Sequence, residues 1–133
     1  MAQGPRHLGE LELSILELLW EQGVCTVKQA HARIGEERDV THNTTQSTMK
    51  RLWEKDLLKR KKQGHAYLYS PCLSRRELTG QMVADLVDEI AGSQIEVALQ
   101  AFVDLADATG KETLAQLEEL VARCRREDEE AGS

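Results

Sequence analysis

The chain has 133 residues, 41% of them hydrophobic, which is enough for one domain with a buried core, and its net charge is −6. No apolar run approaches the ~20 residues that span a bilayer, and the N-terminal stretch MAQGPRHLGE lacks the apolar core of a signal peptide, so a cytoplasmic location is expected. The three cysteines stand alone and the four histidines are scattered, which argues against a disulfide framework and a thiolate metal site; no cofactor is expected.

The charge is distributed unevenly along the chain. Residues 1–80 hold 13 Lys or Arg and 10 Asp or Glu, a net charge of +3, whereas residues 81–133 hold 4 and 13, a net charge of −9. An asymmetry of this kind predicts two parts with different partners. The acidic total therefore does not exclude nucleic acid as a partner of the first part.

The first segment of the chain predicts two helices. From Leu8 to Glu21 apolar residues recur every three or four positions, which is the pattern of a helix with a wide buried face, and Gly23 ends it. The run Thr26-Val-Lys-Gln29 has the spacing of a capping box. It predicts a short second helix that ends near Gly35.

A third helix is expected to begin after Thr41, whose side chain suits an N-cap, and to end near Asp56. Thr45, Met49 and Leu52 share one face, which predicts burial of that side. The opposite side carries polar and charged side chains, namely Asn43, Gln46, Ser47, Lys50 and Glu54, flanked by Thr44 and Arg51.

Two short strands follow, over Leu57–Lys62 and His65–Ser70. Gln63-Gly64 is the predicted hairpin tip, because glycine supplies the positive φ that such a tip requires. The first strand holds four consecutive positive charges, Lys59 to Lys62, and Pro71 is expected to stop the second strand.

The remainder predicts three helices. Ser74-Arg-Arg-Glu77 is a capping-box pattern whose helix ends at Gly92-Ser93, and Thr109-Gly-Lys-Glu112 is another that opens the last helix. The apolar stripes of the last two helices cannot be buried by those helices alone, so a partner chain is expected to cover them. The predicted dimerisation residues are Ile95, Leu99, Phe102, Val103, Leu114, Leu117 and Val121.

These elements predict a mostly α fold with a small antiparallel β-hairpin. Residues 1–72 are assigned to a winged-helix domain, residues 73–128 to a helical dimerisation domain, and residues 129–133 to a flexible tail.

Three helices followed by a basic hairpin is the order of a winged helix-turn-helix, whose third helix enters the DNA major groove. Asn and Gln side chains pair two-pronged with adenine, and Ser and Thr hydroxyls bond several bases. The predicted base-reading residues are Asn43, Thr44, Gln46 and Ser47. The predicted phosphate-binding residues, which set affinity without reading sequence, are Thr41, His42, Lys50, Arg51, Lys59, Lys61, Lys62 and His65.

Four stretches resemble a known family: Leu8-Gly-Glu-Leu-Glu through Leu19-Trp-Glu21, Thr26-Val27, Thr44-Thr45 through Leu52, and Gly64-His-Ala-Tyr-Leu-Tyr-Ser-Pro71. Together they resemble the penicillinase-repressor family of bacterial winged-helix transcriptional repressors, from about Leu8 to Cys124. The resemblance implies a homodimeric repressor that binds a double-stranded DNA operator with inverted TACA/TGTA-type half-sites. It also implies regulated genes for β-lactam resistance or a membrane-linked metalloprotease partner.

The chain departs from the family pattern at several positions. Asp56 stands where glycine is usual, and aspartate takes the same turn conformation at some cost. Asn43 and Gln46 stand where well-known relatives place basic residues, so operator preference is expected to differ in detail. The cysteine-rich C-terminal motif of a copper-responsive branch is missing, so metal sensing is not expected.

The resemblance also implies a route of release from DNA. Relatives are inactivated when a membrane-linked protease cuts before a Phe in the helix after the linker, and the matching bond here joins Ala101 to Phe102. Relatives place Asn before that Phe. A cut would sever the apolar stripe, so each half would lose the effective-concentration advantage of a dimer.

The other chemistry-bearing residues have structural explanations. Cys25, Cys72 and Cys124 are expected to be buried or half-buried small apolar residues, and Trp20 and Trp53 to be core residues. No serine has a partner base at a recognisable spacing, so an enzyme is not expected. The alternatives to a DNA-binding repressor are a winged-helix protein-interaction module and a ligand-sensing regulator; a steep loss of duplex binding with added salt would separate the repressor from the interaction module.

Overall fold

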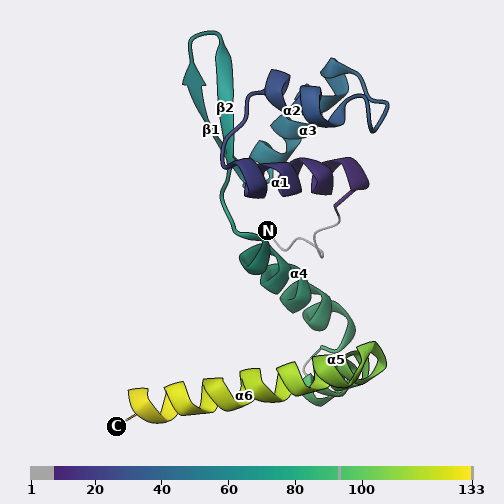
Figure 1. Ribbon diagram of the computed structural model, residues 1–133, viewed down its shortest axis with the longest axis vertical. Helices are drawn as coiled ribbons and strands as arrows, with labels where there is room; N and C mark the ends of the chain where they lie inside the picture. Colours follow the sequence, from purple (N-terminus) through teal and green to yellow (C-terminus); the bar gives the residue numbers. More distant parts are fainter. Residues whose placement is uncertain (1–7, 93, 133) are drawn as a thin grey trace. The chain divides into compact units, whose positions relative to one another are not determined.

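The computed structural model describes residues 8–92 and 94–132, which form two compact units, one reaching to Asp85 and the other beginning at Leu86. The predicted class, mostly helical with one small antiparallel hairpin, is confirmed (Figure 1). The elements in chain order are α1 (Glu10–Gln22), α2 (Val27–Ile34), α3 (His42–Glu54), β1 (Leu58–Gln63), β2 (Ala66–Pro71), α4 (Arg75–Ile90), α5 (Ile95–Thr109) and α6 (Lys111–Ala131).

The first three helices begin and end at local signals that the sequence carries. Thr26 and Gln29 exchange both hydrogen bonds of the predicted capping box, at 3.1 and 2.9 Å. The Thr41 hydroxyl accepts a hydrogen bond from the Thr44 N–H at 3.1 Å and so caps α3. Gly23, at φ 91°, ends α1. These caps satisfy N–H and C=O groups that a helix end leaves unpaired.

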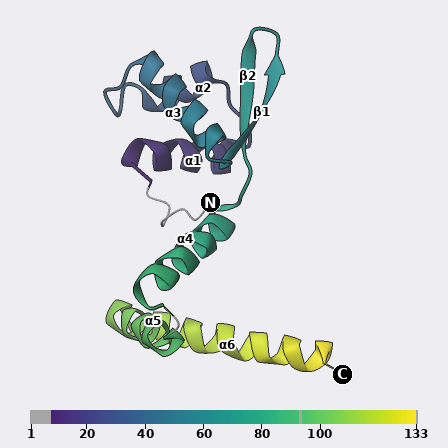
Figure 2. The ribbon, with the colours of Figure 1, turned by 180° about the vertical axis from the view of Figure 1, so that it is seen from behind.

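The hairpin β1–β2, called the wing below, projects past α2 and α3 (Figures 1 and 2). Its ladder reaches from the base to the pair Gln63 and Ala66, so the loop is Gly64-His65, and the predicted tip Gln63-Gly64 is wrong by one residue. Gly64 has φ 64°, which glycine adopts without steric cost at the first loop position. Pro71 is the last residue of β2, where the proline's missing N–H costs the ladder little.

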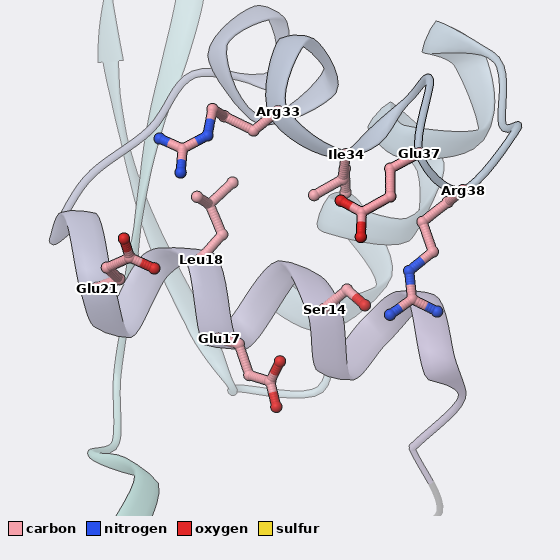
Figure 3. Close-up of a pocket in the computed structure, with 8 residues that line it drawn as sticks. All are labelled: Ser14, Glu17, Leu18, Glu21, Arg33, Ile34, Glu37 and Arg38. Atoms are coloured by element: carbon pink, nitrogen blue, oxygen red, sulfur yellow. The ribbon is translucent and has the colours of Figure 1, made fainter.

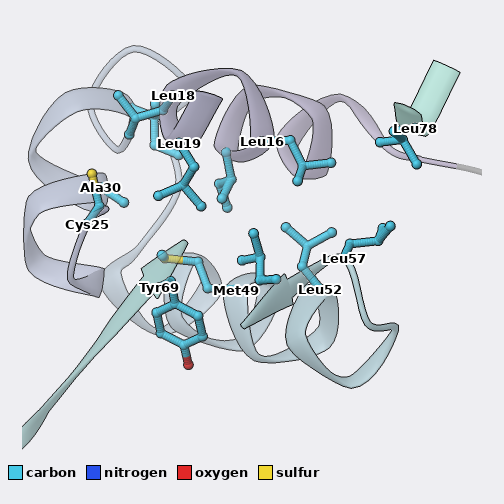
Figure 4. Close-up of a cluster of buried hydrophobic side chains, with 13 residues drawn as sticks. Leu16, Leu18, Leu19, Cys25, Ala30, Met49, Leu52, Leu57, Tyr69 and Leu78 are labelled. Atoms are coloured by element: carbon cyan, nitrogen blue, oxygen red, sulfur yellow. The ribbon is translucent and has the colours of Figure 1, made fainter. Parts of the chain in front are cut away.

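The core of the first unit lies between α1, α3 and the base of the wing. Figure 4 shows Leu16 and Leu19 of α1 facing Met49 and Leu52 of α3. Each of these side chains is at most 1% exposed, and full burial of a side chain of this size stabilises a fold by about 1.5–3 kcal/mol. The core therefore holds α3 in a fixed orientation. The cluster is completed by Ile15, Leu18, Cys25, Ala30, Ile34, Leu57, Leu58, Tyr69 and Leu78.

The two tryptophans lie at the edge of this core and not at its centre. Trp20 and Trp53 are partly buried against it. The indole N–H of Trp20 donates to the carbonyl oxygen of Leu73 at 2.8 Å, which is the partner that a half-buried indole requires.

An ion pair between the buried Glu12 and the exposed Lys55 joins the start of α1 to the end of α3. Glu12 is 8% exposed, and one of its oxygens lies 3.0 Å from the Lys55 ammonium while the other accepts from the Gly9 N–H at 3.1 Å. Burial acts to raise the pKa of the Glu12 carboxyl. The hydrogen bonds from Gly9 and Lys55 and the charges of Lys55 and Arg51 outweigh burial and lower this pKa below its ordinary value.

Asp56 adopts the left-handed conformation, at φ 63°, one residue beyond the C-cap of α3. The Asp56 N–H donates to the Trp53 carbonyl at 3.0 Å, and the Leu57 N–H donates to the Leu52 carbonyl at 2.9 Å. This is the Schellman arrangement, and Leu57 and Leu52 are both buried beneath it. The turn expected of aspartate at this position is confirmed.

The helix α4 begins at the predicted capping box. Ser74 and Glu77 exchange the two hydrogen bonds, at 3.0 and 3.1 Å. Leu78 is 3% exposed in the core of the first unit, and Met82 packs against the same core. The first turns of α4 thus belong to the first compact unit, which reaches to Asp85, whereas the predicted winged-helix domain ends at residue 72. The apolar side chains of α4, rather than the link before it, decide the boundary.

The second unit contains α5 and α6, which pack side by side. The predicted capping box at Thr109–Glu112 is wrong, because Thr109 ends α5 and its hydroxyl donates to the Leu105 carbonyl at 2.7 Å. Gly110, at φ 139°, separates the two helices by itself. The helix α6 continues to Ala131, so residues 129–131 are helical where a flexible tail was predicted, and Ser133 lies outside the described residues.

The cysteines divide into one buried and two exposed side chains. Cys25 is buried in the first unit, and this burial raises the pKa of its thiol. Cys72 and Cys124 are exposed, which corrects the prediction that they are buried or half-buried. Cys72 follows the last residue of β2, and Cys124 lies on a helix with no buried residue among those described.

Candidate nucleic-acid interface

The helix α3 has one buried side and one exposed side, as its sequence pattern predicts. Thr45, Thr48, Met49 and Leu52 are buried. The exposed side carries the predicted base-reading residues together with Lys50 and Arg51. The first acidic residue on this side is Glu54, at the last position of the helix. A polyanion can therefore approach the N-terminal half of α3 without meeting a carboxylate of that helix.

The hydroxyl groups near the start of α3 are occupied by local hydrogen bonds. The Thr41 and Thr44 hydroxyls lie 3.0 Å apart, and Ser47 donates to the Thr44 carbonyl oxygen at 3.2 Å. Thr45 donates to the Thr41 carbonyl at 3.3 Å and lies 3.0 Å from the His31 ring nitrogen. These bonds join the end of α2 to the start of α3 and stabilise the first turn of the candidate reading helix.

Among the four predicted base-reading residues, Asn43 and Gln46 differ from Thr44 and Ser47 in the hydrogen bonding of their side chains. Both are exposed, and in the described part of the chain their side-chain amides make no hydrogen bond. Each amide offers two donor hydrogens and one acceptor oxygen. The two residues that can pair with adenine are thus the two with free polar groups.

The predicted phosphate-binding side chains lie on both α3 and the wing, and all of them are exposed. In the register of the wing, Lys59 and Lys61 point to one face and Arg60 and Lys62 to the other. His65 is in the loop, at the tip. Among the described residues, none of the three wing lysines, Lys59, Lys61 and Lys62, has a salt-bridge partner.

Arg60 is the member of this basic run whose environment differs from what the sequence suggests. It is half-buried, and its guanidinium carbon lies 3.5 Å from the centroid of the Trp53 ring and 4.0 Å from that of Tyr67. Its Nη1 donates to the Tyr69 hydroxyl at 3.3 Å. The sequence shows that Arg60 faces a strand with two tyrosines. It does not show which of these residues Arg60 contacts, because that depends on the register of the two strands.

A separate cavity of about 230 Å³ lies between α1 and the end of α2 (Figure 3). It is lined by Ser14, Leu18 and Ile34 and by charged residues of both signs, Glu17, Glu21, Glu37, Arg33 and Arg38. The Ser14 hydroxyl donates to the Glu10 carbonyl oxygen of its own helix. Within residues 8–92 and 94–132 no group of three His, Cys, Asp or Glu residues could hold a metal ion, and no helix is long and apolar enough to cross a membrane.

The second helix, the third helix and the basic wing define the class of this protein, a winged helix-turn-helix DNA-binding transcriptional regulator. The family model described as penicillinase repressor matches residues 8–123. The chain belongs to the penicillinase-repressor family, and it is a transcriptional repressor of this family rather than an enzyme.

Relatives and solved structures agree with this assignment. The transcriptional regulator BlaI of Mycobacterium tuberculosis is 33% identical over 120 residues, which cover 84% of this chain and 86% of the relative. The solution structure of the DNA-binding domain of the repressor BlaI superposes with a TM-score of 0.50 at 19% identity, over 58% of this chain and 93% of that one. A complex structure of the protein hsRosR also matches at 0.50 and 15% identity, over 91% and 92%. Both structural matches show the fold.

Proposed function

We propose that the protein represses transcription as a homodimer on an inverted-repeat operator, with α3 of each copy in the major groove and the wing on the phosphate backbone. Asn43 and Gln46 read bases, Thr44 and Ser47 support them, and Thr41, His42, Lys50, Arg51, Lys59, Lys61, Lys62 and His65 hold phosphates. The observation that carries this proposal is the pair of free amides on a helix whose opposite side is fixed in the core. Such a helix presents its reading groups without rearrangement, which lowers the entropic cost of binding.

The second unit supports the dimer. In the single chain, Leu99 is 56% exposed, Phe102 42% and Val121 46%, although these side chains are large and apolar. An apolar cavity of about 390 Å³ lies between α5 and α6, and Val103, Leu114 and Leu117 line it. A second copy of the chain offers an identical apolar surface, and a two-fold axis brings two such surfaces together. Two copies would then place two reading helices about one helical turn of DNA apart.

Release from DNA is the finer part of the proposal. The family assignment favours a repressor that acts in the cytoplasm and controls β-lactam response genes. It also favours release by a membrane-linked sensor protease that cuts the Ala101–Phe102 bond. Both residues are exposed in the single chain and lie within α5. Because the bond is helical, cleavage requires local opening of α5. Mass spectrometry of the protein from β-lactam-treated cells should show the two fragments; an intact chain that has left the DNA would reject the cut.

The reading and phosphate roles are tested by two substitutions measured on two duplexes. Gln46→Ala should weaken binding to the selected operator by about 1–3 kcal/mol and leave binding to random duplex unchanged. Lys61→Ala should weaken binding to both duplexes and reduce the slope of log affinity against log salt by about 0.9. Lys111→Ala removes the same charge from the second unit, so it serves as the control and should change neither duplex.

Equal losses by Gln46→Ala on operator and random DNA would reject its role as a base reader. An unchanged salt slope in Lys61→Ala would reject the wing as a phosphate ligand.

A further inference from the structure

We propose that Arg60 is a positioning residue that fixes the angle between the wing and α3, and that it does not bind phosphate. This inference rests on the proposed DNA-binding function. Its guanidinium lies over two aromatic rings from different elements, Trp53 from the last turn of α3 and Tyr67 from β2. The same side chain donates to the Tyr69 hydroxyl. One residue therefore joins the reading helix to both strands of the wing.

The wing needs such a connection because it has little support of its own. It is a two-stranded sheet, and an isolated two-stranded hairpin is marginally stable in water. Its base is anchored by Leu58 and Tyr69, which are 1% and 2% exposed, and the Tyr69 backbone exchanges two hydrogen bonds with Cys25, at 2.8 and 3.0 Å. From Lys61 to Ala66 every residue is exposed. Arg60 is thus the last residue of β1 that is held by the rest of the unit.

Arginine suits this position better than lysine does. Its planar guanidinium stacks on aromatic faces and still presents N–H groups at its edge, whereas a lysine ammonium is a compact and strongly hydrated charge. The Arg60 guanidinium lies over two aromatic rings, and one of its N–H groups donates to the Tyr69 hydroxyl. By contrast, Lys61 lies on the opposite face of the wing, exposed and without a salt-bridge partner among the described residues.

The consequence for DNA binding is geometric. The wing lysines can reach the backbone while α3 is in the groove only if the hairpin keeps one angle to the helix. A looser hairpin retains every phosphate-binding charge but pays the entropy of ordering when DNA binds. Loss of Arg60 positioning should therefore lower affinity without changing the number of phosphates neutralised.

The test uses the full chain and a duplex that the wild-type protein has selected from a pool of random sequences. Arg60→Lys and Arg60→Met should both weaken binding roughly tenfold while the salt slope stays unchanged. Lys61→Met is the matched control and should reduce the slope by about 0.9. All affinities are measured far below the melting temperature of each variant, where a loss of stability alone leaves the folded fraction, and hence the affinity, unchanged.

Tyr67 allows a second test that involves no charge. Tyr67→Leu should weaken binding, though by no more than Arg60→Met does, and it should add little to the loss in the double variant, because Arg60→Met has already removed the contact with Tyr67. Tyr67→Phe keeps the ring and should bind as the wild type does. An Arg60→Lys variant that binds normally beside an Arg60→Met variant whose salt slope falls by about 0.9 would make Arg60 a phosphate ligand and overturn the proposal.

Hydrogen exchange in the free protein separates this proposal from the proposed function. Backbone amides of residues 61–66 should exchange faster in Arg60→Lys and Arg60→Met than in the wild type, and unchanged exchange would overturn the positioning role. If the wild-type chain bound duplex DNA without salt dependence, the proposed function would fail, and the exchange measurement would still decide whether Arg60 holds the wing.

Discussion

The two units of this chain handle their apolar residues in opposite ways. In the first unit, Ile15, Leu19 and Leu52 are fully buried by residues of the same unit. In the second unit, Leu99 and Leu105 of α5 are 56% and 64% exposed, and among its described residues only Ala98 and Ala106 are buried. The first unit has closed its core without help, whereas the second has two apolar helices and no completed core. The difference supports the proposal that the first unit folds alone and that a second copy of the chain completes the core of the second unit.

The same contrast appears in the charges. Basic side chains of the first unit concentrate on the wing and on the exposed side of α3, whereas the last two helices are rich in acidic residues on their exposed positions. A negative surface is repelled by the DNA backbone and a positive one is attracted to it. Charge and burial therefore divide the chain in the same way, into a basic unit with a closed core and an acidic unit with exposed apolar helices.

The largest effect should come from placing a charge on the open surface of the second unit. Phe102→Glu should raise the dimer dissociation constant at least about a thousandfold, because two-fold symmetry buries the unpaired carboxylate twice. Sedimentation equilibrium measures this constant. Glu96→Gln alters an exposed residue of the first turn of α5 and should leave the dimer intact. A dimer of normal strength in Phe102→Glu would mean that the copies meet elsewhere.

A matched pair of leucine truncations should sharpen the comparison. Leu52→Ala should lower the free energy of unfolding of residues 1–85 by about 2–5 kcal/mol, because it opens a cavity in a closed core. Leu99→Ala in the full chain should leave the unfolding of the first unit unchanged and weaken the dimer instead. Chemical denaturation followed by circular dichroism would check both. Equal effects of the two truncations on the first unit would show that the units share one core.

The ion pair of Glu12 with Lys55 predicts a stability that depends on pH. The folded-state pKa of Glu12 lies below its ordinary value of 4.5, so the pair stabilises the fold above the pKa of the unfolded carboxyl. That contribution is lost as the pH falls through the lowered folded-state pKa. Glu12→Gln should therefore show a smaller loss of stability than the wild type between neutral pH and about pH 3, measured by urea denaturation. If the free energy of unfolding fell equally with pH in the two proteins, Glu12 would not be the source of the pH dependence.

The smallest effect should come from the turn after α3. Asp56→Gly should stabilise the first unit by up to about 1 kcal/mol, because glycine takes the left-handed conformation at lower cost than aspartate. Thermal unfolding would detect this as a higher melting temperature. Alanine has neither the conformational freedom of glycine nor the short polar side chain of aspartate, so Asp56→Ala should be less stable than the wild type. A gain of stability in Asp56→Ala would contradict the explanation.

Much of the fold was predictable because its signals are local. Capping residues such as Thr26 and Thr41, and the buried face through Met49 and Leu52, depend on neighbours a few positions away. The errors arose where distant contacts decide. Leu78 joins α4 to the first core although nothing in its own segment shows this. A capping box was predicted to begin at Thr109, but Thr109 is the last residue of α5.

The sequence predicted which residues of α3 are exposed, but it did not predict how their polar groups are engaged. The alternation of polar residues along α3 indicated which side faces outward, and the structure places all four predicted base readers there. The sequence could not separate the free amides of Asn43 and Gln46 from the occupied hydroxyl of Ser47. Nor could it distinguish Arg60 from the lysines beside it, since that distinction depends on the register of the wing and on Trp53.

The central claim is that two copies of the chain, each with a DNA-binding first unit whose core is closed, dimerise through the second unit, whose core is incomplete in one copy. The most direct measurement is the stoichiometry and affinity of the full chain and of residues 1–85 on one duplex that carries an inverted repeat, by sedimentation velocity with labelled DNA. The account predicts two full-length copies per duplex bound cooperatively, and weaker, independent binding of folded monomers by residues 1–85. A full chain that is monomeric at micromolar concentration and binds one copy per duplex, with the same affinity as residues 1–85, would contradict it.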